Sequence, residues 1–225
     1  MEVKANRSER KGDVDMKHKW VITIGREYCS GGAATGRAVA DALGIAYYDK
    51  SIVDEAADLA KIDTYTAQKL DEKPVSYVSM ASSLMSYSYN NYYAGDPDLM
   101  MPVGLKVAAA QSQVIETIAE REPCVIVGRC ADFILRNRDY VFNVFLRADL
   151  GVRVARAMEL YGLDAANAKK VIKQTDKIRA SYFNGHTQQV WGDPANHHLI
   201  LDVGKFGIEG SAKIIAEAVR VLDEK

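Results

Sequence analysis

One stretch near the start of the chain decides the fold: residues 21–45 read VITIGREYCSGGAATGRAVADALGI. The β-branched run Val21–Ile24 is followed by a turn rich in Gly and Ser, and then by small and apolar residues at helical spacing. Small residues let the backbone N–H groups of such a turn point into one concavity, and the following helix adds its positive N-terminal end. The stretch therefore predicts a strand, an anion-binding loop and a helix.

The loop matches the common fingerprints only in part. It contains no G-x-G, which disfavours a dinucleotide site and an NAD-dependent oxidoreductase. The phosphate-loop pattern G-x-x-x-x-G-K-[ST] fits in two registers, one on Gly31 and Gly36, the other ending the loop at Gly31 and Gly32. We favour the second, because it leaves a helix of about three turns, near the mean length. It puts Gly32 at the lysine position and Ala33 at the hydroxyl position, so a plain glycine-rich turn stays the alternative.

Four more short apolar runs, none alternating with polar residues, are typical of strands buried on both faces. They are Ile45–Asp49, Cys124–Gly128, Val141–Leu146 and His198–Asp202. The predicted helices between them are Ser51–Leu70, Leu105–Glu120, Leu150–Tyr161, Asp164–Tyr182 and Ile208–Leu222. The class is therefore α/β, with a central, mostly parallel five-stranded sheet covered by helices.

Two parts of the chain contain no predicted strand, and they indicate how the chain is organised around the sheet. Residues 1–19 are polar and show no apolar periodicity, so we expect a flexible N-terminal tail before a single domain over 20–225. The interval from about 50 to 105 has no strand of its own and is interpreted as a helical lobe inserted between two strands. Exposed lysines such as Lys169, Lys170 and Lys173 are interpreted as a solvated face.

The composition of the chain limits the kinds of partner that it can bind. The 29 Lys and Arg against 30 Asp and Glu give a net charge of −1, which argues against a nucleic-acid binder and favours a small ligand. No apolar stretch approaches the roughly 20 residues of a membrane span. Cys29, Cys124 and Cys130 form no C-x-x-C pair and are expected to be reduced thiols. We therefore expect a cytoplasmic protein without membrane partners, and a homo-oligomer is compatible with this composition.

From Trp20 to its end the chain resembles the cytidylate kinase-like family, a branch of the P-loop nucleoside and nucleotide kinases. The resemblance rests on Gly25–Gly32, Tyr48-Asp49, Val127–Asp132, Thr175–Tyr182 and Trp191–Pro194. It implies a three-layer P-loop kinase sandwich, an acceptor-binding helical lobe over about 50–105, and a lid over about 161–195. It also implies ATP, Mg²⁺ and small nucleotide substrates.

The resemblance, together with the need of phosphoryl transfer for positioning and for cations, implies the site residues. The expected phosphate-binding residues are Arg26, Ser30, Gly31, Gly32, Ala33 and Arg37. The expected acceptor-binding residues are Asp49, Arg129 and Asp132, with Asp49 and Asp132 as candidates for metal or acceptor contacts. The expected catalytic residues of the lid are Arg153, Arg156, Asp176 and Arg179, with Tyr182, Trp191 and Asp193 as further lid residues. In the alternative, Arg129 and Asp132 form a structural bridge.

The function implied is transfer of the γ-phosphoryl group of ATP to a nucleoside monophosphate or a similar small phosphorylated acceptor. The sequence departs from the family pattern at the loop lysine, for which Arg26, Arg37 and Lys50 are the nearby cations. A non-catalytic nucleotide-binding regulator is therefore the alternative. We expect Arg153, Arg156 and Arg179 to be largely exposed before a ligand binds, because an unpaired buried charge is costly.

Overall fold

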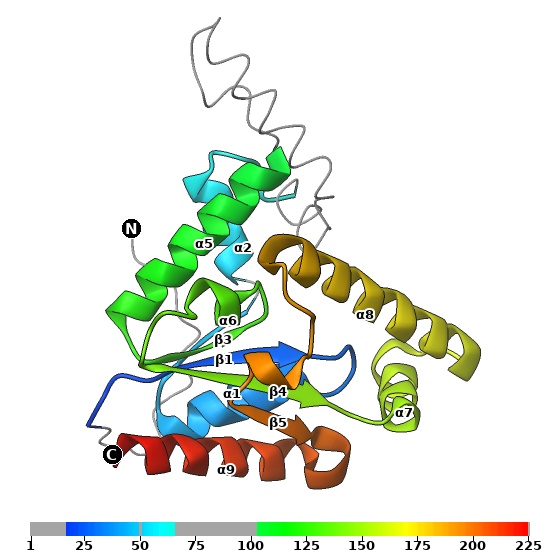
Figure 1. Cartoon of the computed structure of the whole chain (residues 1–225). Helices are drawn as coiled ribbons and strands as arrows, with labels where there is room; N and C mark the ends of the chain where they lie inside the picture. Colours follow the sequence, from blue (N-terminus) through cyan, green and yellow to red (C-terminus); the bar gives the residue numbers. More distant parts are fainter. Residues whose placement is uncertain (1–16, 50, 66–102, 225) are drawn as a thin grey trace, which may run out of the picture.

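The structure is a computed structural model that describes residues 17–49, 51–65 and 103–224 (Figure 1). Its centre is a sheet with the strand order β2-β3-β1-β4-β5, in which every neighbouring pair is parallel. The strands are β1 Val21–Arg26, β2 Ala46–Tyr48, β3 Cys124–Val127, β4 Val141–Arg147 and β5 Leu199–Asp202. The predicted five-stranded sheet is confirmed, and it is parallel throughout.

Helices cover both faces of the sheet. They are α1 Gly32–Leu43, α2 Ser51–Leu59, α5 Val103–Arg121, α6 Ala131–Ile134, α7 Leu150–Tyr161, α8 Ala165–Thr187 and α9 Val203–Asp223, with the short 3-10 helix η2 at Pro194–Asn196. Helices α1 and α9 pack on one face, and α2, α5 and α6 on the other (Figure 1). This confirms the three-layer sandwich. None of the helices described here is long and apolar enough to span a bilayer.

The central strand β1 shows why apolar residues run through the strands without alternation. Ile22 and Ile24 belong to the core beneath α1 and α9, whereas Val21 belongs to the core on the opposite face. Burial on both sides makes each of these side chains contribute, at about 25 cal/mol per Å² of apolar area. The polar exception is Thr23, whose hydroxyl donates a hydrogen bond of 2.6 Å to the Asn143 side chain on β4.

Two helix predictions near the glycine loop have different outcomes. Helix α1 begins at Gly32, as the favoured register requires. The predicted helix Ser51–Leu70 is wrong, because α2 ends at Leu59. Lys61 adopts a left-handed φ of 54°, and the Ile62 amide returns to the Ala57 carbonyl at 2.9 Å while Ile62 packs against Ala57. This is a Schellman-type end formed without the usual glycine.

Other boundaries moved less. Helix α8 runs to Thr187 rather than Tyr182, and the short helix α6 was not predicted. Most of the predicted helical lobe, residues 66–102, lies outside the described residues, as does Lys50. The described part of the expected tail is attached: the amides of Lys17 and His18 donate to the Asp223 carboxylate at 2.7 and 2.8 Å.

Candidate active site

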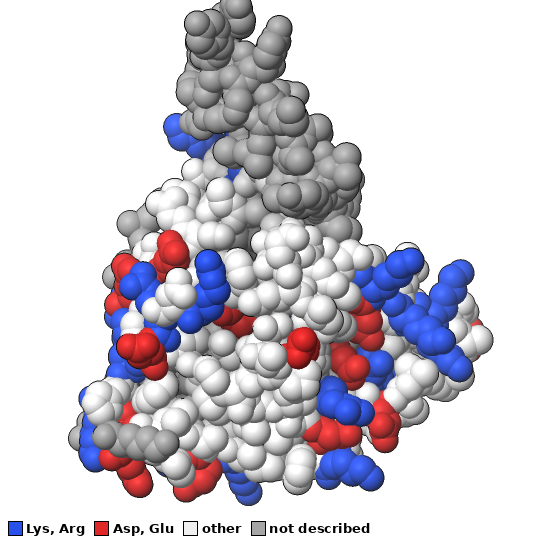
Figure 2. Space-filling model, viewed as in Figure 1, with Lys and Arg blue, Asp and Glu red and all other residues white. Residues whose placement is uncertain are grey.

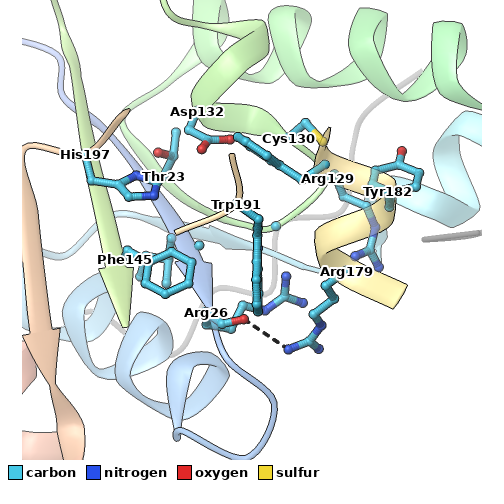
Figure 3. A pocket seen from close by; sticks show the side chains of 14 residues that line it. Thr23, Arg26, Arg129, Cys130, Asp132, Phe145, Arg179, Tyr182, Trp191 and His197 are labelled. Carbon is cyan, nitrogen blue, oxygen red and sulfur yellow. Dashed lines mark hydrogen bonds between the residues drawn. The ribbon is translucent and has the colours of Figure 1, made fainter. Parts of the chain in front are cut away.

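A pocket lies at the carboxyl ends of β1, β3 and β4, the edge where open parallel sheets bind ligands (Figure 3). Six of the residues predicted for the site line it: Arg26, Arg129, Asp132, Arg179, Tyr182 and Trp191. The rest of the lining is Thr23, Ile24, Gly25, Gly128, Cys130, Phe145, Phe183 and His197. The pocket is partly open to solvent, and its narrow part holds about 40 Å³, enough for one or two waters.

Strained backbone positions Arg129 in this pocket. Directly after β3, Gly128, Arg129 and Cys130 have φ values of 79°, 58° and 55°, three left-handed residues in succession. The left-handed region costs an ordinary residue roughly 1–2 kcal/mol, and such strain gathers at functional sites. Glycine suits position 128 because an L side chain is strained at a φ of 79°, and a Cβ there would also displace the tip of the Arg26 side chain. The turn places Arg129 in the pocket wall with only 6% of its surface exposed.

Asp132 follows on the first turn of α6 and is half-buried. Burial raises the pKa of its carboxyl from 3.8 to about 6, because few polar partners compensate the lost water. Among the interactions of the described residues, none is an ion pair between Arg129 and Asp132, so the structural-bridge alternative is not supported. Both side chains instead line the same pocket.

The predicted phosphate-binding loop leads into α1. Gly31 is the N-cap of the helix, and Gly32 and Ala33 form its first turn, whose amides have no partner within an α-helix. Ser30 turns its hydroxyl back to the Glu27 carbonyl at 2.9 Å. Ser30, Gly31, Gly32 and Ala33 lie beside the pocket wall formed by Arg26 but do not line the pocket themselves.

Helices α7 and α8 hold this loop by its backbone. Arg153 on α7 pairs with Asp176 on α8 at 2.6 Å and with Glu27 at 3.6 Å, and it donates to the Tyr28 carbonyl at 3.3 Å. Asp176 in turn accepts the Tyr28 amide at 2.7 Å. The expectation that Arg153 is exposed is therefore wrong, since only 8% of its surface is accessible. Its negative partners are loop and helix groups distant in sequence, so no ligand is needed to compensate its charge.

The other two lid arginines are half-buried rather than exposed. Arg156 donates to the Cys29 carbonyl at 3.0 Å, and a Cβ on Gly31 would lie 2.7 Å from its guanidinium nitrogen. Arg179 donates to the Arg26 carbonyl at 3.2 Å (Figure 3). Of the four residues predicted to be catalytic, only Arg179 lines the pocket, while Arg153, Arg156 and Asp176 contact the loop beside it.

Two of the predicted site residues, Arg37 and Asp49, do not line the pocket. The Arg37 guanidinium stands 4.4 Å from the centre of the Tyr47 ring. Asp49 is 3.9 Å from the Arg26 guanidinium and accepts a hydrogen bond of 3.4 Å from the Tyr47 hydroxyl. Arg37 thus belongs to the outer surface of α1, and Asp49 forms an ion pair with Arg26 without lining the pocket itself.

Of the further residues predicted for the lid, Tyr182 and Trp191 line the pocket and Asp193 does not. Trp191 meets Phe145 edge to face at 5.3 Å between ring centres, and the Tyr182 hydroxyl donates to Gln111 at 3.2 Å. Asp193 does not line the pocket; its carboxylate caps η2 by accepting the Ala195 amide at 2.9 Å. Figure 3 shows Arg129 and Arg179 to one side of Trp191, and Phe145 with His197 to the other.

Sequence reasoning missed His197, which lines the pocket just before β5. Its ring stacks on Phe145 at 5.1 Å, and both ring nitrogens are buried with no hydrogen-bond partner among the described residues. Burial lowers the pKa of the imidazole to about 4, so it is neutral at physiological pH. A histidine at a strand start carries no sequence signal for this position, because only the fold brings it beside Phe145.

A second, larger cavity of about 260 Å³ adjoins the first between α5, α6 and α8. The two cavities share Arg129, Cys130 and Tyr182. The polar lining of the second one also includes Gln111, Ser112, Glu116, Arg136 and His186. Arg129 therefore stands in the wall that the two cavities share.

The described side chains do not fit a Mg²⁺ site built by the protein alone. Within residues 17–49, 51–65 and 103–224, no three His, Cys, Asp or Glu side chains gather as metal ligands. Ala33 stands where the phosphate-loop pattern has a hydroxyl, and Asp49 is next to Arg26. Mg²⁺ in nucleotide sites takes many of its ligands from phosphates and water, so the nucleotide would have to supply most of them.

The predicted solvated face is confirmed. Lys169, Lys170, Lys173 and Lys177 on α8 are exposed, and Figure 2 shows blue side chains gathered along this helix, away from the uncharged centre of the face. These lysines are outside both cavities.

Comparison with known proteins agrees with the geometry. The model of the cytidylate kinase-like family matches residues 21–205. A solved structure of an uncharacterized protein from Eubacterium ventriosum ATCC 27560 is 25% identical, with a TM-score of 0.66, and the match covers 89% of this chain and 98% of that one. No curated protein matches the chain.

Two kinases are more distant. A shikimate kinase from Bacteroides thetaiotaomicron is 15% identical with a TM-score of 0.49, covering 89% of this chain and 98% of that one. A gluconokinase from Sinorhizobium meliloti 1021 is 16% identical with a TM-score of 0.48, covering 91% and 94%. Similarity this low assigns no activity.

Proposed function

The chain belongs to the cytidylate kinase-like family, and on this basis we propose that it transfers the γ-phosphoryl group of ATP to a nucleoside monophosphate or a similar small phosphorylated acceptor. Family membership supports a small-molecule kinase; the acceptor class is the finer part of the proposal. ATP, expected with Mg²⁺ on its phosphates, is the donor.

The observation that carries the proposal is the meeting of Arg26, Arg129 and Arg179 in one pocket at the carboxyl edge of the sheet. Asp132 is the single carboxylate among the lining residues. Guanidinium groups that meet in one pocket are suited to phosphate groups, whose oxygens they can bind two at a time. The start of α1 adjoins this pocket and offers free amide donors to further phosphate oxygens.

The two cavities suggest how the substrates are arranged. The donor's phosphates would lie between the start of α1 and Arg26, and the acceptor would lie in the larger cavity beside α5 and α6. Arg129, which lines both cavities, would hold the acceptor phosphate. Asp132 would accept a hydrogen bond from the acceptor's sugar or base.

The chemical step then needs little from the protein except position and charge. A terminal phosphate oxygen of the acceptor attacks the γ-phosphorus of ATP. The bond from this phosphorus to the β,γ-bridging oxygen breaks, and its electron pair leaves with ADP. Arg179 lines the pocket from the lid side, where it would stabilise the charge that spreads over the moving group.

One observation favours a second candidate, a nucleotide-binding regulator without turnover. Gly32 stands at the lysine position of the loop, and the Arg156 side chain donates to the loop carbonyl of Cys29 at 3.0 Å. A protein of this kind would bind ATP without releasing ADP.

Turnover separates the two candidates. ADP release is measured with ATP, Mg²⁺ and a panel of CMP, dCMP, UMP, AMP and acceptors that carry no phosphate. We expect ADP release that depends on one of the phosphorylated acceptors. Tight ATP binding by calorimetry with no ADP release from any acceptor would assign the regulator instead, and release only with acceptors lacking phosphate would contradict the acceptor class.

A further inference from the structure

We propose that Arg26 replaces the missing loop lysine: the base of its side chain occupies the space that a side chain at position 32 would need, and its guanidinium supplies the cation that holds the donor phosphates. This inference rests on the proposed function, because it assigns the phosphates to the donor. It goes further by naming one residue among three nearby cations and by giving the reason for glycine at position 32.

Position 32 and Arg26 compete for one space. A Cβ on Gly32 would lie 2.6 Å from the Cβ of Arg26 and 2.7 Å from its Cγ. Carbon atoms without a bond between them do not approach so closely, and the base of the Arg26 side chain cannot swing away as a flexible tip could. A lysine at position 32 and an arginine at position 26 are therefore mutually exclusive in this backbone.

The Arg26 side chain carries its charge to the pocket. The guanidinium lines the pocket, lies 3.9 Å from Asp49, and fills the space that a Cβ on Gly128 would need. Its side chain is only 12% exposed, so its charge is weakly screened by water. Gly32 thus leaves room for the base of the Arg26 side chain, and the guanidinium lies beside Gly128.

Of the two other cations, Arg37 is the one that the structure describes, and it does not meet these conditions. Arg37 lies over the Tyr47 ring on the outer side of α1, and Lys50 is outside the described residues. Among the described residues that line the pocket, Arg26 is the cation that also contacts position 32. An arginine presents a planar fork that can bind two phosphate oxygens at once, whereas a lysine acts as a point charge.

The test exchanges the two side chains. The variants are Arg26→Gly, Gly32→Ala and the swap Arg26→Gly with Gly32→Lys. Glycine rather than alanine is used at position 26 because the Cβ of residue 26 is itself one of the clashing atoms. Two controls match them: Gly151→Ala, a helical glycine with no atom within 4 Å of its Cβ position, and Arg220→Ala, an exposed arginine on α9. Melting temperatures identify any variant that does not fold.

Binding of inorganic tripolyphosphate, which carries no base, is measured by calorimetry. We expect Arg26→Gly and Gly32→Ala each to weaken binding about tenfold or more, the former by removing the cation and the latter by displacing it. The swap should recover affinity to within about threefold of the wild type. Both controls should bind as the wild type does. Unchanged binding in folded Arg26→Gly or in Gly32→Ala overturns the proposal, and so does a folded swap variant that recovers nothing.

ATP turnover on the same variants keeps this inference separate from the proposed function. A wild-type protein that binds tripolyphosphate through Arg26 but transfers phosphate to no acceptor removes the kinase function and leaves the inference. Turnover that is undiminished in Arg26→Gly removes the inference and leaves the kinase function.

Discussion

Three consecutive left-handed residues, Gly128, Arg129 and Cys130, decide where the Arg129 side chain lies. At the scale of single residues, the site depends on backbone conformations that helices and strands do not use, because such a conformation directs a side chain to a place that regular structure would not reach. The raised pKa of Asp132 and the buried ring of His197, with no hydrogen-bond partner among the described residues, are further unusual features of the same pocket. Each of these costs stability, and a bound ligand would offset that cost.

Arg129→Ala should weaken acceptor binding by about tenfold or more and ATP binding much less, because the residue stands at the wall shared with the larger cavity. Calorimetry with CMP and with ATP measures both. Arg220→Ala on the far helix α9 is the control. Equal losses for both ligands would contradict the assignment of Arg129 to the acceptor.

Asp132→Asn should stabilise the protein at pH 7.5 by up to about 3 kcal/mol. The pKa of Asp132 rises from 3.8 to about 6 on folding, so the folded state loses stability as the pH rises through this interval, and the full cost remains above pH 6. Asparagine does not titrate. Urea unfolding from pH 4 to 8 should show a difference that is smallest near pH 4 and constant above about pH 7.

A difference that does not change with pH would contradict this account. His197 contributes a pH dependence of the opposite sign. Its pKa is lowered to about 4 in the folded state, so the protein loses stability as the pH falls from 6.5 towards 4 and the unfolded state takes up the proton. Both proteins carry His197, so its contribution cancels in the difference between them.

At the scale of elements, α7 and α8 act on the loop between β1 and α1 through three arginines with different tasks. Arg153 is buried between two carboxylates, Arg156 holds one carbonyl, and Arg179 reaches the pocket. Stability and catalysis should therefore separate between the first and the last of them.

Arg153→Ala should destabilise the protein by about 2–4 kcal/mol, because it leaves Glu27 and Asp176 without their partner in a poorly hydrated place. Chemical denaturation measures the loss, with the exposed residue change Lys169→Ala as the control. A change within about 0.5 kcal/mol of the wild type would show that this ion pair does not fasten the lid helices.

Arg179→Ala should lower kcat by roughly 10²-fold and raise the KM for ATP much less, as expected for a group that acts on the transition state. Steady-state kinetics and a melting curve are measured together. Unchanged turnover with a lower Tm would make Arg179 a structural brace like Arg153.

The elements also show what a sequence can and cannot reveal. Strands buried on both faces leave continuous apolar runs, so all five were located to within about two residues. The end of α2 was missed because Lys61 takes the left-handed position that glycine usually marks. The burial of Arg153 was missed because Glu27 and Asp176 lie far from it along the chain and meet it only in the fold.

At the scale of the whole molecule, we expect the pocket, whose narrow part holds about 40 Å³, to widen when a nucleotide binds. Trp191 lines this pocket, whereas the second tryptophan, Trp20, donates a hydrogen bond to Asp223 on α9. In a Trp20→Phe variant, the remaining emission should therefore shift in wavelength or intensity when ATP is added. A Trp191→Phe variant should show no such change, and an unresponsive Trp191 despite ATP binding would contradict opening at this place.

The strand order has a consequence for how the chain is made. Strand β1 is central in the sheet, yet its neighbours β3 and β4 begin only at Cys124 and Val141, and β2 pairs with β3 alone. A ribosome adding about 5–20 residues per second needs several seconds or more to reach them. During that time two apolar strands exist without the strands that they pair with in the described sheet, so the nascent chain exposes apolar segments of the kind that favour aggregation.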